Sequence, residues 1–145
     1  MVKKQSTAAV LQLLARDLLA DRHLYTNANG TSCMLLLRDP FYISIPLSAL
    51  SHVRLQINEY NVPESCMALS VREQFIQISA CRQIRELYWH MGECAQLIVS
   101  DVVLPGLLQQ KNHIELCLTV RPPYNYGLSE ENIEYTVAAE MGVTV

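Results

Sequence analysis

Alternation of apolar and polar residues with a period of two constrains the fold of this chain more than any other feature. Five runs show it, at residues 43–47, 53–58, 67–72, 76–79 and 113–120. Successive side chains of a strand point to opposite faces of a sheet, so each run can bury one face and expose the other. Shorter, more continuously apolar runs at 34–37, 97–99 and 102–104 are typical of strands buried on both faces.

Many short strands separated by turns favour a mainly β fold over a parallel βαβ sheet. We expect an antiparallel β barrel or sandwich formed by a single domain over residues 1–145, with its β core at 33–121. Half of the residues are apolar, which is enough for a substantial core in a chain of 145 residues.

The two ends of the chain carry helical patterns. Residues 6–20 have one apolar stripe, and Ser6 is a suitable N-cap. Residues 129–142 also carry an apolar stripe and helix-end signals, with Ser129 before two glutamates at the start and Gly142 at the end. We therefore predict short flanking helices at both ends. The members of the two stripes are Val10, Leu11, Leu14 and Leu18, and then Ile133, Val137 and Met141.

One internal segment, residues 82–91, fits either a helix or a strand with a turn. Its apolar residues Ile84, Leu87, Tyr88 and Met91 have helical spacing. A true helix there, together with the N-terminal helix and a sheet, would suit an alternative fold, an α+β dimer like the small acidic secretion chaperones.

Charge and cysteine usage restrict the partners and the compartment. The net charge of −3 provides no field that attracts a phosphate backbone, so binding of nucleic acid, for instance by a single-strand-binding barrel, is disfavoured. The apolar runs are too short to cross a bilayer, and no membrane partner is expected. The five cysteines are odd in number and contain no Cys-x-x-Cys pair, which favours free thiols in the cytoplasm or the nucleus.

Motifs for catalysis or metal binding are weak. The spacing of His90 with Cys94 and of His113 with Cys117 is compatible with zinc, but neither pair has the tight Cys-x-x-Cys half of most structural sites. The chain also has no nucleophile elbow, phosphate loop or dinucleotide fingerprint. We therefore predict no catalytic residues, no metal and no cofactor.

The last three residues suggest a partner. An apolar-x-apolar tripeptide that ends in a carboxylate is the ligand of a PDZ groove, which adds the tail as a strand. Val143, Thr144 and Val145 fit this pattern. We predict them as a free, partner-binding tail.

The strand pattern also resembles the dUTPase fold over roughly residues 30–123. Segments 41–46, 53–57 and 62–67 have the family's order of a strand ending in Ile-Pro, a second strand and a Pro turn. Arg72 falls where the family's Arg-Ser pair begins, but Glu73 replaces the serine. Residues 84–88 resemble the uridine-binding segment, with Tyr88 at the stacking position and Arg85 at the position of the water-activating aspartate.

A competing alignment matches residues 92–98 to the family's Gly-Asp-Arg-Ile-Ala-Gln-Leu-Ile motif, and the two alignments exclude each other. Both leave the family's first motif and its glycine-rich tail unmatched. Within the superfamily the chain is most similar to the non-enzymatic dUTPase-like early regulatory proteins of adenoviruses. That resemblance implies host-protein partners, a PDZ-binding tail and assembly as a homotrimer.

The sequence thus predicts a non-enzymatic adaptor that binds other proteins, as a homotrimer or a homodimer. Arg72, Arg85 and Tyr88 would mark a degenerate nucleotide site, because arginine cannot act as the base that deprotonates water. The chaperone-like dimer is one alternative. An active dUTP hydrolase, in which Glu86 or Glu93 supplies the missing carboxylate, is another.

Overall fold

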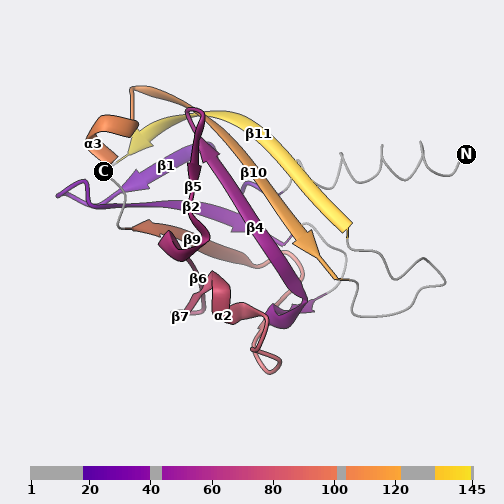
Figure 1. Ribbon diagram of the computed structural model, residues 1–145. Helices are drawn as coiled ribbons and strands as arrows, with labels where there is room; N and C mark the ends of the chain where they lie inside the picture. Colours follow the sequence, from indigo (N-terminus) through magenta and orange to yellow (C-terminus); the bar gives the residue numbers. More distant parts are fainter. Residues whose placement is uncertain (1–17, 40–43, 101–103, 122–132, 145) are drawn as a thin grey trace, which may run out of the picture.

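The computed structural model describes residues 18–39, 44–100, 104–121 and 133–144, and the protein within these limits is mainly β. One nine-stranded sheet, in the order β5-β4-β10-β11-β1-β2-β9-β6-β7, curls into a half-barrel (Figure 1). Its strands are β1 (His23–Thr26), β2 (Ser32–Arg38), β4 (Leu50–Ile57), β5 (Tyr60–Val62), β6 (Met67–Val71), β7 (Gln74–Gln77), β9 (Cys94–Ser100), β10 (Lys111–Val120) and β11 (Ile133–Thr144). All neighbouring strands are antiparallel except β1 and β11.

Short elements complete the architecture. A two-stranded sheet pairs β3 (Ile45–Pro46) with β8 (Tyr88–Trp89). The helical elements are η1 (Leu47–Ala49), η2 (Glu64–Cys66), α2 (Ile78–Cys81) and α3 (Leu104–Leu107). No helix among the described residues has the length and apolar character needed to span a membrane.

The curl of the sheet follows from its connections. Strand β5 is at one edge of the sheet and β6 is next to the opposite edge, yet only the short segment around η2 joins them. Five residue steps, from Val62 to Met67, reach at most about 18 Å. The two ends of the sheet must therefore approach each other, and α2 contacts both η2 and β4 there. The apolar rows face the enclosed side, where Leu24, Ile57, Leu97, Leu116 and their neighbours are almost fully buried.

Two-residue turns close the edge hairpins. Residues Asn58 and Glu59 join β4 to β5, and Arg72 and Glu73 join β6 to β7. All four residues have positive φ, between 47° and 70°. Positive φ at both central positions is the type I′ geometry that matches the twist of a β-hairpin.

Several predictions from the sequence are confirmed. The period-two runs at 53–58, 67–72 and 113–120 correspond to β4, β6 and β10, and the apolar runs at 34–37 and 97–99 lie in β2 and β9. The run at 76–79 is split, because β7 ends at Gln77 and α2 begins at Ile78.

The predicted C-terminal helix at 129–142 is wrong, because residues 133–144 form β11. This strand pairs with β10 on one side and with β1 on the other. The β core therefore extends past residue 121 to Thr144 and begins at β1 rather than at residue 33.

The ambiguous segment 82–91 is a turn followed by β8, and the helix that the chaperone-like alternative required is missing there. The predicted N-terminal helix lies largely outside the described residues. Only Leu18, Leu19 and Ala20 are described. They continue the pairing beside β2, with a bridge from Leu19 to Leu37.

Candidate functional site

The outer face of the sheet over β4, β10 and β11 carries an open polar trough. Residues on these strands that alternate with the core residues point outward, and the strand register places them in rows. One row consists of Arg54, Cys117 and Thr136. The next consists of His52, Thr119 and Glu134. Two adjoining hollows of about 500 and 430 Å³ share Arg54 and Glu64 and follow these rows.

Arg54 is central to the trough. Its Nη2 atom lies 3.2 Å from Oε1 of Glu134 and donates a hydrogen bond of 3.3 Å to Sγ of Cys117. The Arg54 and Glu134 side chains remain 66% and 59% exposed. An ion pair this exposed contributes little to the stability of the fold, since water screens both charges. Breaking the contact between these two groups therefore costs little free energy.

A β-bulge organises the other end of the trough. Thr119 pairs with His52 but Val120 pairs with Leu50, so Ser51 is the extra residue of β4. The carbonyl of Ser51 accepts a 2.8 Å hydrogen bond from Nε of Arg82, just after α2.

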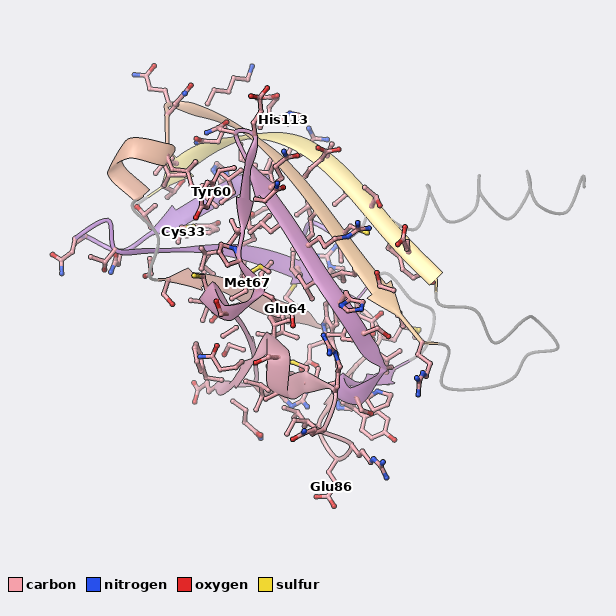
Figure 2. All side chains as sticks on the ribbon, in the orientation of Figure 1. Cys33, Tyr60, Glu64, Met67, Glu86 and His113 are labelled. Atoms are coloured by element: carbon pink, nitrogen blue, oxygen red, sulfur yellow. The ribbon has the colours of Figure 1, made fainter. Side chains whose placement is uncertain are left out.

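The same guanidinium group holds two trough residues in place. Nη2 of Arg82 lies 3.2 Å from Oε1 of Glu64 and 3.4 Å from Nδ1 of His52. Because arginine can only donate, Nδ1 of His52 is the acceptor in this contact. Figure 2 shows Glu64 near η2, beside β4. Arg82 thus links α2 to the bulge and η2 where the two ends of the sheet meet.

The trough presents charged and hydrogen-bonding side chains. Nucleophilic catalysis by a cysteine requires a neighbouring base that accepts the thiol proton. The group hydrogen-bonded to Cys117 is Arg54, which remains protonated and cannot accept a proton. The hollow around His52, Thr119 and Glu134 is open and lined by charged, imidazole and hydroxyl side chains, and the adjoining hollow also has Val53, Leu55, Val62 and Leu116 in its lining.

A second polar cluster contains two of the three predicted nucleotide-site residues. Arg72 forms an ion pair with the Glu93 carboxylate, and its Nη2 atom donates a 2.7 Å hydrogen bond to the carbonyl of Tyr88. The amide of His90 also donates to the Glu93 carboxylate, at 3.0 Å. Partial burial raises the pKa of Glu93, but the hydrogen bonds from Arg72 and the His90 amide outweigh it, so the pKa is lowered overall. The cluster fastens the β6–β7 turn to the turn between β8 and β9.

Arg85 does not join this cluster. It is exposed in the turn before β8, and no hydrogen bond or ion pair of its side chain involves the described residues. Its neighbour Glu86 points away from the protein at the tip of the same turn (Figure 2). The structure therefore brings Arg72 next to the backbone of Tyr88, while Arg85 lies apart from both.

The predicted tail is not free. Val143 and Thr144 are the last residues of β11 and pair in parallel with Leu24 and Tyr25 of β1. Oγ1 of Thr144 lies 3.2 Å from Nδ1 of His23. The prediction of a free tail is therefore wrong for these two residues, because the sheet uses their backbone. Val145 lies outside the described residues.

The histidines of the two His–Cys pairs considered for zinc contact other side chains. His113 Nδ1 lies 2.9 Å from Glu140 Oε1, and His90 Nδ1 lies 3.3 Å from Ser44 Oγ. In the part of the chain that the structure describes, no group of three or more His, Cys, Asp or Glu side chains is arranged to hold a metal ion.

Sequence reasoning missed the trough. Arg54 and Thr119 were recognisable only as members of polar rows, Cys117 was considered only as a zinc ligand with His113, and Glu134 belongs to a segment predicted as helix. Their proximity depends on the pairing of β10 with both β4 and β11. A scan against protein families and a search of curated proteins found no match to this chain.

Proposed function

We propose that this protein is a non-enzymatic binding protein that docks another protein along the outer trough of β4, β10 and β11. The resemblance to the dUTPase-like early regulatory proteins of adenoviruses extends this proposal to a viral regulator of host proteins. The observation that carries the proposal is the exposed Arg54–Glu134 pair above Cys117, beside the Arg82–Glu64 pair. The exposed Arg54–Glu134 pair can be exchanged for complementary charges on a protein surface, while Arg82 keeps Glu64 in place beside it.

Charge reversal tests the trough. Affinity purification with the wild-type protein should recover a partner that R54E loses by at least roughly tenfold, the scale of one charge contact at an interface. The double variant R54E/E134R restores an internal ion pair with reversed polarity, so it should fold normally and still fail to bind. R85E, in an exposed turn outside the trough, is the matched control and should bind like the wild type.

Equal recovery of the same partner by the wild type and R54E would refute docking at the trough. Recovery by the double variant but not by R54E would mean that the ion pair supports the fold rather than recognition. A thermal melt of each variant separates these cases from simple unfolding.

The enzyme alternative has a direct test. Hydrolysis of dUTP needs a carboxylate free to take a proton from water, and the Glu93 carboxylate is already bound by Arg72 and by the amide of His90. We expect incubation with dUTP and Mg²⁺ to release no pyrophosphate above background. Release above background would overturn the proposal in favour of a hydrolase, with Glu93 as the base if E93Q abolishes it and Glu86 if E86Q does.

Binding of residues 143–145 by a PDZ domain stays a prediction, and it would require part of β11 to detach from the sheet. The PDZ groove needs the backbone of the tail as an added strand, so Val143 and Thr144 would first have to leave β1. Deletion of the three residues should abolish pull-down of PDZ proteins while R54E leaves it intact. Light scattering decides between the predicted homotrimer or homodimer and a monomer.

A further inference from the structure

The outer face of the sheet changes character beyond β1. Over β2, β9, β6 and β7 it carries an apolar strip, where the same face over β4, β10 and β11 is polar. The strip residues alternate with core residues. Met34, Ile98 and Ala68 form one paired row across β2, β9 and β6, which ends at Gln77 on β7. The neighbouring row runs from Leu36 through the polar Gln96 and Ser70 to Phe75. Its members are Met34, Leu36, Ile98, Ala68 and Phe75.

The exposed fractions of the strip side chains indicate that another element of structure covers this face. Met34, Leu36 and Ile98 are half-buried, and Ala68 is buried although it lies outside the core cluster. Phe75 on the edge strand β7 is 52% exposed. A sheet with one face on the core and the other in water alternates apolar and polar residues, so a second apolar face indicates a covering element.

We propose that residues 6–17 of the same chain form an amphipathic helix that packs on this strip. The predicted stripe of Val10, Leu11 and Leu14 supplies a matching apolar face, and Gln12 and Arg16 lie on the opposite side of such a helix. This proposal is independent of the trough, which occupies the other half of the sheet.

The attachment point of the segment lies beside the strip. The carbonyl of Leu18 accepts a 2.9 Å hydrogen bond from the amide of Arg38, and the amide of Ala20 donates to the carbonyl of Leu36, also at 2.9 Å. Leu18, where the described part of the chain begins, therefore lies opposite Arg38 at the end of β2. In Figure 1, β2, β9, β6 and β7 follow one below another from this end.

The length of the segment matches the width of the strip. Twelve helical residues span about 18 Å at 1.5 Å per residue. The three spacings from β2 to β7 amount to about 14 Å at 4.8 Å per strand. The helix can thus reach from Leu36 to Phe75. Because the segment is tethered at Leu18, its own chain outcompetes a second copy at ordinary concentrations.

Labelling of an introduced thiol tests the docking in the full chain. The variant I98C is made in a background in which Cys66 and Cys94 are replaced by serine, because the remaining native thiols are buried. We expect the introduced thiol to react with a maleimide at least roughly tenfold more slowly than in the same protein carrying L11E and L14E. That factor corresponds to a docked form about ten times as populated as the free one.

The matched control carries Q12E and R16E, on the opposite side of the predicted helix, and should keep the slow rate. Equal labelling rates with and without L11E and L14E would overturn the proposal. Thermal melts confirm that each variant keeps the sheet.

A disulfide distinguishes the same chain from a neighbour. Under mild oxidation in the same background, L14C/I98C should give a cross-linked monomer on a non-reducing gel. A cross-linked dimer would overturn docking within one chain in favour of exchange between two copies. Failure to cross-link, with fast labelling of I98C, would leave the strip uncovered by this segment and refute the proposal.

Discussion

Asn112 offers the sharpest test of how the barrel is held together. Its side chain is fully buried near the start of β10, and all of its hydrogen-bonding groups are used. Oδ1 accepts from the amide of Gln109 and from Nδ2 of Asn58, each at 2.8 Å. Nδ2 donates to the carbonyls of Gln109 and Met141, at 2.8 and 3.3 Å. One side chain thus ties together the β4–β5 turn, the start of β10 and the end of β11.

The substitution N112A removes all four bonds and leaves their partners in a partly buried place. Each hydrogen bond contributes a net value of about 1 kcal/mol, and less where water reaches the freed groups. We therefore expect the free energy of unfolding to fall by about 2–4 kcal/mol. Stability in a domain of this size is only about 5–15 kcal/mol, so the loss is large. At about 3–5 °C per kcal/mol, the melting temperature should fall by roughly 10 °C.

The nearly isosteric N112D separates hydrogen bonding from packing. It replaces two donors by an acceptor that faces the carbonyls of Gln109 and Met141, and it buries a charge. We expect it to be at least as destabilised as N112A at pH 7. Burial beside carbonyls raises the pKa of the introduced carboxyl in the folded state, so this penalty grows as pH rises above the unfolded value and shrinks towards pH 4.

Urea denaturation followed by circular dichroism measures these differences. N61A is the matched control, because Asn61 is an exposed asparagine on the edge strand β5, and its removal should change stability by no more than about 0.5 kcal/mol. Should N112D be as stable as the wild type at pH 7, or N112A lose no more than N61A, the assigned network would not hold this end of the barrel.

Two further predictions concern ionisable groups. Burial raises the pKa of the Cys33 and Cys81 thiols to about 11, with Glu64 adding to the effect at Cys81. At pH 8 a thiol reagent should therefore modify them roughly a hundredfold more slowly than the exposed Cys94, and fast modification of Cys33 in the folded protein would contradict its burial. The lowered pKa of Glu93 stabilises the fold above the unfolded value of about 4.3, and this contribution disappears as pH falls through the folded pKa. E93Q should consequently be less stable than the wild type at pH 7 by a margin that narrows towards pH 3 in urea titrations, and a margin independent of pH would exclude the ion pair as its cause.

Local patterning was enough to predict most strands. The alternation in 53–58, 67–72 and 113–120 commits these segments to a half-buried sheet, because a shift by one residue would turn every apolar side chain outward. The absence of a regular βαβ rhythm likewise indicated a mainly β fold, as the half-barrel has.

The C-terminal strand could not be recognised with the same rules. Val137 and Met141 lie four residues apart, which suits one helix face, but Tyr135, Val137, Ala139 and Met141 also alternate as a strand. Both periods fit, and local propensity is a weak guide when they do. The tertiary structure decides for a strand. The edges of β10 and β1 carry backbone hydrogen-bonding groups, and only a strand between them pairs with both edges.

The candidate site depended even more on tertiary structure. The sequence by itself determined that polar residues would line the outward rows, and it suggested Arg72 and Tyr88, which do lie together through a backbone contact. Only the register of β4, β10 and β11 brings Arg54, Cys117 and Glu134 into one trough, although up to 80 residues separate them in the chain. The physical reason is that a period of two fixes which face a side chain occupies, while its neighbours across the sheet depend on which strands pair and in what register.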